Sequence, residues 1–305
     1  MKRRMPILAL LLLALAAAAA EPEVAITVAF TEGPAADAEG NVYFTETTFN
    51  RIMKLSKDGT LSVFRENSNG ANGLVFDAQG RLVVCEGGDR KAGRPRVTRI
   101  DVKTGKLEVL ADSFGAQPLS QPNDVTIDSK GRIYFTDFAS PVAVYRIDTD
   151  GKVSRLLAPP QIEKPNGIIV SPDDKTLYLV EANRATEKGA RMIRAYDLQP
   201  DGTLRNMRVF HNFSPGRSAD GMCIDTKGNL YAAAGLNRLR GSPETLDTKA
   251  GVYVFAPDGK LLRFTPIPED LITNCAFGGP DNKTLFVTAG KTLFRIQNDI
   301  PGLPR

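Results

Sequence analysis

The chain has 305 residues, with 39 basic and 35 acidic side chains and a formal net charge of +4. Three positive charges, on Lys2, Arg3 and Arg4, precede an apolar run from Ile7 to Ala20, so the rest of the chain carries only +1 (36 basic less 35 acidic). This nearly neutral balance gives no reason to expect a nucleic-acid partner. The remaining 285 residues (305 less 20) fit one large all-β domain.

Residues 1–20 have the layout of a cleavable secretory signal peptide. The basic start is followed by an apolar run that is short for a membrane span and ends in small residues before Glu21 and Pro22. No cysteine follows the run directly, which argues against a lipoprotein anchor, and an uncleaved membrane anchor is the alternative. We expect export to the periplasm or the extracellular space, residues 21–305 as one domain, and no stable membrane association after cleavage.

The three cysteines, Cys85, Cys223 and Cys275, do not have the spacing of a metal site. Each lies in or beside an apolar segment, so we expect small buried core residues. A disulfide between two of them is the alternative, because export would permit it.

A sequence motif with its parts in a fixed order recurs six times along the chain. A polar lead residue, usually followed by Gly, opens an apolar strand, and a tight turn and a second apolar strand follow. Successive lead residues are separated by 40, 51, 43, 54 and 54 positions, a period that is typical of one four-stranded propeller blade. The six lead residues are Glu32, Asn72, Asn123, Asn166, Asp220 and Asn274.

The first repeat shows the elements in order. After Glu32 the strand reaches the turn Asp37-Ala38-Glu39-Gly40, in which Asp favours a type I turn and Gly takes the left-handed position that follows. A second strand is expected at 41–46, and outer strands at 51–55 and 61–65. The same turn recurs at 77–80, 128–131 and 225–228, and further outer strands are expected at 144–147, 153–157, 251–255 and 260–264.

The two ends of the chain complete one repeat. The sixth repeat has two strands after Asn274 and a third at 292–297, and the apolar run 24–30 can supply its fourth. Pairing the first and last strands in one blade removes an exposed sheet edge. We therefore expect an all-β, six-bladed β-propeller with four antiparallel strands per blade and no long helix.

The lead residues indicate a metal. Each copy of the motif would begin with an innermost strand, so the six lead residues would meet at one mouth of the central channel. One such Asn or Asp alone is explained by bonds to local backbone, but carboxylates held together in a narrow channel repel, and burying them without a cation is costly. Oxygen donors suit a hard cation, whereas a His/Cys zinc site cannot be built from one histidine.

We expect one divalent cation, Ca²⁺ in preference to Mg²⁺, Mn²⁺ or Zn²⁺. Glu32 and Asp220 would supply charge, while Asn123 and Asn166 would supply neutral oxygens. Asn72 is placed beside the metal or at the substrate, and Asn274 is expected to be mainly structural.

Several segments carry a resemblance to a known family. They are Glu-Gly-Pro at 32–34, Gln-Pro-Asn-Asp at 121–124, Lys-Pro-Asn-Gly at 164–167, Asp-Gly-Met-Cys-Ile-Asp at 220–225 and Thr-Asn-Cys-Ala-Phe-Gly-Gly-Pro-Asp at 273–281. After residue 20 the chain resembles throughout the regucalcin/gluconolactonase family (SMP-30/gluconolactonase/luciferin-regenerating-enzyme-like) of six-bladed, metal-dependent lactonases.

The resemblance implies metal ligands at Glu32, Asn166 and Asp220, a metal or substrate contact at Asn123, and a catalytic acid/base role for Asp220. Two positions depart from the family pattern: Gln121 stands where an arginine is frequent, and Gly87 where many bacterial members have histidine. These departures leave the natural substrate open.

The expected function is metal-dependent opening of a sugar lactone to an aldonic acid, with the cation as Lewis acid and Asp220 as general acid or base. The alternatives are a non-catalytic ligand-binding propeller and a related metal-dependent esterase or phosphotriesterase. A serine hydrolase is disfavoured, because no Gly-x-Ser-x-Gly occurs and the lone histidine, His211, is expected on the surface of an outer strand.

Strand direction predicts which loops surround the site. Loops after each second strand should lie at the same mouth as the lead residues, and three of them are basic: 89–96 with Arg90, Arg94 and Arg96, the segment Arg184–Arg191, and 237–240 with Arg238 and Arg240. They form either a positive rim that attracts anionic or hydroxyl-rich substrates or a set of ordinary solvated loops.

Overall fold

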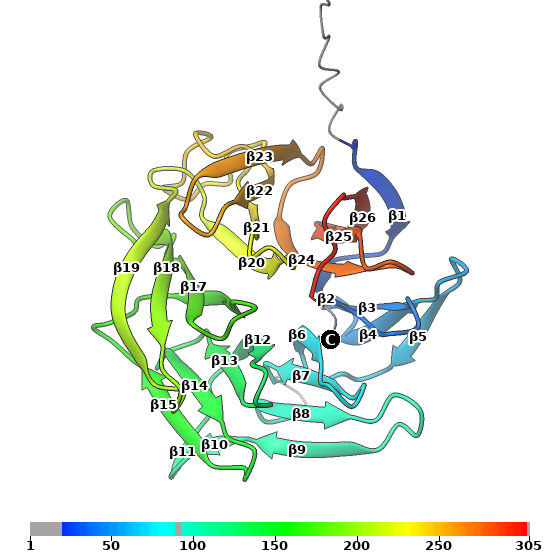
Figure 1. Ribbon diagram of the computed structural model, residues 1–305, viewed down its shortest axis with the longest axis vertical. Helices are drawn as coiled ribbons and strands as arrows, with labels where there is room; N and C mark the ends of the chain where they lie inside the picture. Colours follow the sequence, from blue (N-terminus) through cyan, green and yellow to red (C-terminus); the bar gives the residue numbers. More distant parts are fainter. Residues whose placement is uncertain (1–19, 89–92, 304–305) are drawn as a thin grey trace, which may run out of the picture.

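The computed structural model describes residues 20–88 and 93–303 (Figure 1). Within these ranges the structure is all-β, and no helix is long and apolar enough to cross a membrane. Six four-stranded antiparallel sheets stand around a central axis as the blades of a propeller. The predicted fold class is confirmed. Residues 1–19 of the expected signal peptide lie outside the described residues.

Each blade begins at the axis and proceeds outward. The innermost strands are β2 (Thr31–Ala36), β6 (Ala71–Phe76), β12 (Pro122–Ile127), β16 (Pro165–Val170), β20 (Ala219–Ile224) and β24 (Ile272–Gly278). The second strands are β3 (Val42–Glu46), β7 (Leu82–Glu86), β13 (Ile133–Asp137), β17 (Thr176–Ala182), β21 (Leu230–Ala234) and β25 (Thr284–Ala289). We number the blades 1 to 6 in this order.

The outer half of each blade follows the same order. The third strands are β4 (Arg51–Leu55), β8 (Arg96–Ile100), β14 (Ala143–Ile147), β18 (Arg191–Leu198), β22 (Gly251–Phe255) and β26 (Thr292–Gln297). The fourth strands are β5 (Leu61–Arg65), β9 (Leu107–Ala111), β15 (Val153–Leu157), β19 (Leu204–Asn212), β23 (Leu261–Pro266) and, in blade 6, β1 (Glu23–Thr27). A short hairpin, β10 (Ser113–Phe114) and β11 (Gln117–Pro118), connects blades 2 and 3.

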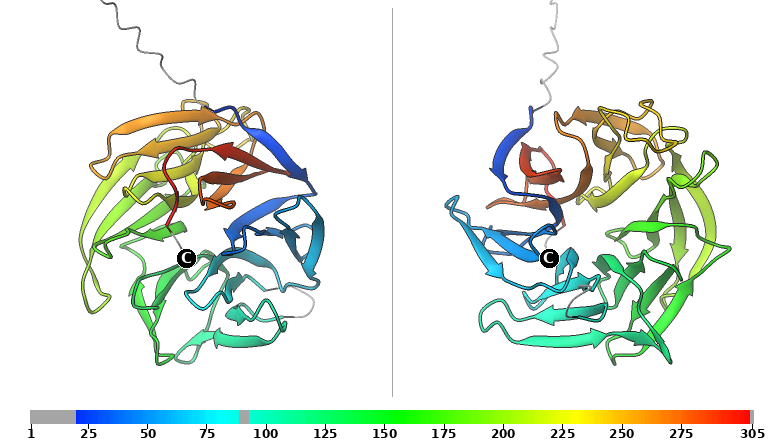
Figure 2. Two further views of the ribbon diagram at one scale, coloured as in Figure 1. Left: turned by 45° about the vertical axis from the view of Figure 1, so that its right-hand side comes forward. Right: turned by 180° about the vertical axis from the view of Figure 1, so that it is seen from behind.

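The ring closes through the first and last strands, as expected. In Figure 1, β1 lies along the outer edge of β26, and Val24 is opposite Phe294 while Ile26 is opposite Leu293. The closing strand ends at Thr27, three residues earlier than the expected segment. Beyond β26 the chain turns back toward the middle of the ring (Figure 2), where Gly302 forms a β-bridge with Asp225.

The residue after most lead residues is glycine because neighbouring innermost strands nearly touch at the axis. Each of these strands contains a bulge that interrupts its register with the second strand. A Cβ on Gly167 would lie 2.4 Å from the Asp220 carbonyl oxygen, and one on Gly221 would lie 2.0 Å from Asn274 Cγ. A side chain at Gly167 or Gly221 would collide with the next blade, so these glycines of the repeated motif are required for packing.

The apolar core lies between blades. Tyr43 of blade 1, for example, packs with Leu74, Phe76 and Val84 of blade 2. All three cysteines are buried, as predicted, and the Sγ atoms of Cys223 and Cys275 are 3.3 Å apart across blades 5 and 6. The Asp turns also form as expected: Asp77 Oδ1 accepts hydrogen bonds from the amides of Gln79 and Arg81.

Ring closure is expected to be a major source of stability. Leu293 of β26 is 0 % exposed and lies opposite Ile26 of the closing strand. Leu293→Ala should lower the free energy of unfolding by about 2–5 kcal/mol, because a cavity replaces the packed side chain. Leu262→Ala, at a side chain that is 51 % exposed, is the matched control and should change it by less than about 1 kcal/mol. Equal losses in chemical denaturation would contradict this role for the closing strands.

Candidate active site at the mouth of the central channel

Five of the six lead residues line one cavity at the channel mouth. The cavity has a volume of about 570 Å³, and its wall includes Glu32, Asn72, Asn123, Asn166 and Asp220, one from each of blades 1 to 5. The chain thus brings together oxygen donors that are up to 188 positions apart (220 less 32). Every residue predicted as a metal, catalytic or substrate residue is among these five.

The sixth lead residue is placed differently, and the expectation that all six converge was wrong for Asn274. In blade 6, Asn274 pairs with Thr288, and Thr273 occupies the bulge. Register with blade 5 therefore equates Thr273 with Asp220, and Asn274 with Gly221. Accordingly Thr273 lines the cavity, while Asn274 lines a second, deeper cavity of about 300 Å³. The repeat in blade 6 begins one residue earlier than the sequence pattern indicates.

Asp124 has a buried carboxyl group, and the sequence analysis assigned it no role. It occupies the position that is glycine in blades 1, 2, 4 and 5, and it points into the channel, where a Cβ on Gly73 would lie 2.6 Å from its Oδ1. Its carboxyl accepts hydrogen bonds from the amides of Val125 at 3.0 Å and Ile168 at 3.4 Å. An acidic residue in place of the repeated glycine is the signal that could have identified it.

Glu32 is the carboxylate with the least compensation. Burial in the channel raises its pKa well above the usual range, and the charges of Asp220 and Asp124 raise it further. Its hydrogen bond from the Gly33 amide is long, at 3.3 Å. Among residues 20–88 and 93–303, no lysine or arginine forms an ion pair with it.

Asp220 is compensated by a residue that the sequence interpretation did not include. Arg217, in the loop before β20, places Nη2 2.9 Å from Asp220 Oδ2, and both side chains are largely buried. Burial still raises the pKa of Asp220, although Arg217, Arg184 and a hydrogen bond from Asn166 all act to lower it. The predicted need for a cation is therefore met in part by the protein itself.

The remaining donors fit a hard divalent cation. Within the described residues no three His, Cys, Asp or Glu side chains form a metal cluster by themselves, so the protein would rely on two carboxylates and amide oxygens. In the described ranges Glu32 forms no ion pair, although the charge of Arg217 lowers its pKa, and no protein hydrogen bond to the Asn123 side chain is found. Such oxygen donors are those that Ca²⁺ and Mg²⁺ select.

The basic loops contribute less uniformly than expected. Arg184 and Arg240 line the cavity, but Arg96 donates from Nε to Glu86 Oε2 at 2.7 Å, and Arg191 is fully buried, bonding carbonyl groups of its own loop. Arg96 is thus not free to meet a substrate, which corrects that part of the rim prediction. Arg90 lies outside the described residues.

His211 does not belong to the site. It lies on the outer strand β19, as expected, but it is half-buried between the rings of Phe213 and Phe255, at centroid distances of 4.5 and 4.6 Å. The prediction of a plain surface residue was therefore wrong, because aromatic packing covers the ring.

The second cavity includes the end of the described chain in its wall. Asp124 and Asn274 line it together with Leu303. The Asn282 amide donates to the carbonyl oxygens of Gly302 at 2.8 Å and Leu303 at 3.0 Å. The lead residues of blades 1 to 5 thus line the first cavity, and Asp124 lines the second.

Fold and site together define a six-bladed propeller of the kind that presents enclosed carboxylates to a ligand at its axis. Comparison with protein families matches residues 30–291 to the SMP-30/Gluconolactonase/LRE-like region. The chain belongs to this family, and the resemblance seen in the sequence is confirmed.

Individual relatives agree with this assignment. The chain is 27% identical to a gluconolactonase of Zymomonas mobilis, over 90% of this chain and 80% of that protein. It is 29% identical to regucalcin of Danio rerio, over 83% and 80% of the two chains. Among solved structures, a gluconolactonase of Xanthomonas campestris superposes with a TM-score of 0.76 at 29% identity, over 92% of this chain and 90% of that one.

The buried Asp124 should make stability depend on pH. Burial raises its pKa from 3.8 to about 7, so the folded state favours the protonated acid. The contribution of Asp124 to stability is therefore complete below about pH 4 and is lost as pH rises to about 7, by roughly 4 kcal/mol at 1.36 kcal/mol per pH unit. In chelator-treated protein, Asp124→Asn should remove this loss, and its advantage over wild type should grow across that window.

Urea unfolding at each pH measures the effect. Asp258→Asn, at an exposed turn where Oδ1 accepts only the Lys260 amide, is the control and should run parallel to wild type. A constant difference between Asp124→Asn and wild type from pH 4 to 8 would contradict the assignment.

Proposed function

We propose that the protein is a metal-dependent lactonase that opens a sugar lactone to the corresponding hydroxy acid. One observation carries the proposal: Glu32 and Asp220 face one cavity together with Asn123 and Asn166, in a chain whose relatives include gluconolactonases. A cavity of this size accommodates a ligand as large as a monosaccharide lactone.

In this proposal Glu32, Asn166 and Asp220 hold the cation, with Asn123 contacting either the cation or the substrate. When bound, a divalent cation, Ca²⁺ by preference, would polarise the lactone carbonyl. Asn72 would hydrogen-bond a hydroxyl of the sugar. These roles use every oxygen donor that the lead positions of blades 1 to 5 supply.

Asp220 is the proposed proton carrier. It would accept a proton from the attacking water as the carbonyl carbon is attacked, and return it to the ring oxygen as the acyl C–O bond breaks. Arg217 holds Asp220 Oδ2 at 2.9 Å, which fixes the orientation of the carboxylate and favours its ionised form. Burial acts in the opposite direction on the Asp220 pKa, and a group balanced in this way can serve as both base and acid.

Removing either charge should disable the site without unfolding the propeller. Glu32→Gln and Asp220→Asn should each weaken Ca²⁺ binding by at least about tenfold in isothermal titration calorimetry, and should abolish lactone hydrolysis. Circular dichroism should show an unchanged fold. Glu108→Gln, at an exposed carboxylate, is the matched control. Full activity of either site variant at limiting metal would refute the ligand assignment.

Asn72→Ala should have a milder effect than the two charge variants. Loss of one neutral hydrogen bond corresponds to about 1 kcal/mol, so we expect kcat/KM to fall about fivefold while Ca²⁺ affinity stays within about twofold. A loss of Ca²⁺ affinity as large as that in Glu32→Gln would make Asn72 a metal ligand instead.

A substrate panel decides between lactonase and the other functions. We expect turnover of D-glucono-1,5-lactone that chelator abolishes and added Ca²⁺ restores, and no turnover of the phosphotriester paraoxon. Turnover of paraoxon alone would assign the site to a phosphotriesterase. Binding of lactone without turnover of either substrate would assign it to a non-catalytic propeller.

A further inference from the structure

One wall of the site cavity is cationic. Arg184 follows β17 of blade 4, Arg217 precedes β20 of blade 5 and Arg240 follows β21 of blade 5, and all three line the cavity. The opposite wall, from blades 1 to 3, contributes Phe30, Gln121 and Phe138 with Asn72. Among the described residues that line the cavity, the arginines therefore lie on the side of blades 4 and 5.

Two of these arginines form no close ion pair with a described carboxylate, although the charge of Arg184 lowers the pKa of Asp220. In the described part of the chain, neither Arg184 nor Arg240 forms an ion pair. Lys164 Nζ lies 3.7 Å from the Phe138 ring centroid and donates to the Phe138 carbonyl oxygen, and within the described residues it forms no ion pair.

Arg217 completes the wall from within. It is 6 % exposed, and while Nη2 pairs with Asp220, its buried Nε has no hydrogen-bond partner. An unpartnered buried donor of a charged group is costly. Besides Asp220, this wall contains the acidic residue Glu244, which accepts a hydrogen bond from the Ser242 hydroxyl at 2.8 Å.

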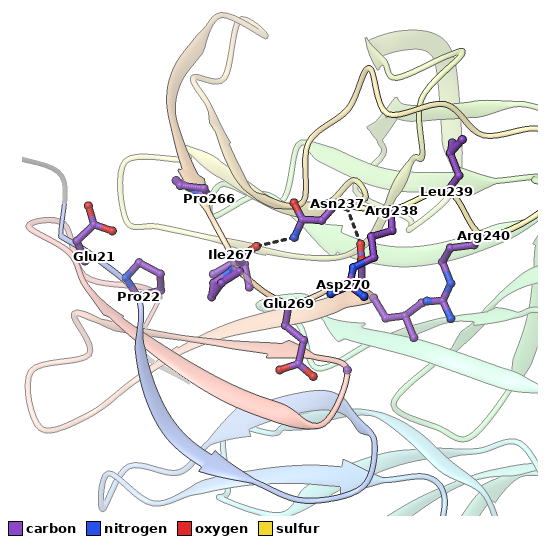
Figure 3. A pocket seen from close by; sticks show the side chains of 13 residues that line it. Glu21, Pro22, Asn237, Arg238, Leu239, Arg240, Pro266, Ile267, Glu269 and Asp270 are labelled. Atoms are coloured by element: carbon purple, nitrogen blue, oxygen red, sulfur yellow. Dashed lines mark hydrogen bonds between the residues drawn. The ribbon is translucent and has the colours of Figure 1, made fainter.

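The loop that carries Arg240 is anchored. The Asn237 amide donates to Asp270 Oδ1 at 2.6 Å, and Asn237 Nδ2 donates to the Ile267 carbonyl oxygen at 3.0 Å (Figure 3). A second cleft, drawn in Figure 3, lies beside the site cavity, and both Arg240 and Glu269 line it. Arg240 lies apart from Glu269 in this view. Arg240 lines both that cleft and the site cavity, so the anchored loop holds its charge at the border of the site.

We propose that this wall binds a carboxylate of the substrate, so that the protein acts on lactones that keep a free carboxylate, those of aldaric acids, in preference to neutral aldonolactones. The inference rests on the proposed function. With the reacting lactone at Glu32 and Asp220, a carboxylate at the far end of the sugar would reach the guanidinium groups, whose forked donors match it. Gln121 on the opposite wall offers no such charge.

The test uses two lactones that differ at one carbon. D-Glucaro-1,4-lactone carries a carboxylate where D-glucono-1,4-lactone carries a hydroxymethyl group. Wild-type kcat/KM should be at least about tenfold higher for the glucarolactone, mainly through KM. Arg184→Gln and Arg240→Gln should each lower this preference about fivefold, and the double variant should bring the ratio near one. Arg238→Gln, on the same loop but not lining the site cavity, should leave it unchanged.

A binding measurement separates this inference from the lactonase proposal. Chelator-treated protein should bind D-glucaro-1,4-lactone more tightly than D-glucono-1,4-lactone, and Arg184→Gln should remove the difference. If this holds but neither lactone is opened, the proposed function fails and the carboxylate wall stands. If both lactones are opened equally by wild type and by the double variant, the lactonase stands and the wall is refuted. Faster, Arg184-dependent opening of 6-phospho-D-glucono-1,5-lactone would overturn the carboxylate assignment in favour of phosphate.

Discussion

The close approach of six innermost strands at the axis determines both the fold and the site. Backbone meets backbone there: a single added Cβ on Gly167 would lie 2.4 Å from the Asp220 carbonyl oxygen. The glycines make this contact possible, and the preceding lead residues are consequently forced into one small space. A structural requirement of ring packing thus places Glu32 and Asp220, from blades 1 and 5, within reach of one ligand.

The same crowding sets the electrostatics. Burial raises the pKa of Glu32, Asp124 and Asp220, and neighbouring carboxylates raise those of Glu32 and Asp124 further. The protein compensates the three groups to different degrees. Asp220 has Arg217, Asp124 has two backbone amides and lies where protonation is favoured, and Glu32 has one long amide contact. This graded compensation leaves Glu32 as the group with the most to gain from a bound cation.

The sequence allowed most of the fold and five positions of the site to be predicted, because lead residue, glycine and Asp turn are local patterns repeated in phase. Three features could not be obtained that way. Asn274 was assigned one residue out of phase, since Thr273-Asn274-Cys275 has no glycine to mark the bulge. Asp124 was given no role because it directly follows the lead residue Asn123, at the position of the repeated glycine. Arg217 lies in a loop whose burial depends on neighbouring blades. Long-range packing decides such positions.

Ring closure also has a consequence for how the molecule is made. The strands that close blade 6 pair residues about 270 positions apart, Val24 with Phe294, and Glu32 follows the first of them by only five residues beyond Thr27. Such a contact is slow to form because its loop-closure entropy is lost before any pairing is gained. Blade 6 is therefore completed only when the two ends of the chain pair, and this pairing brings blade 1 into place beside it. The candidate site cavity is therefore complete only when folding is complete.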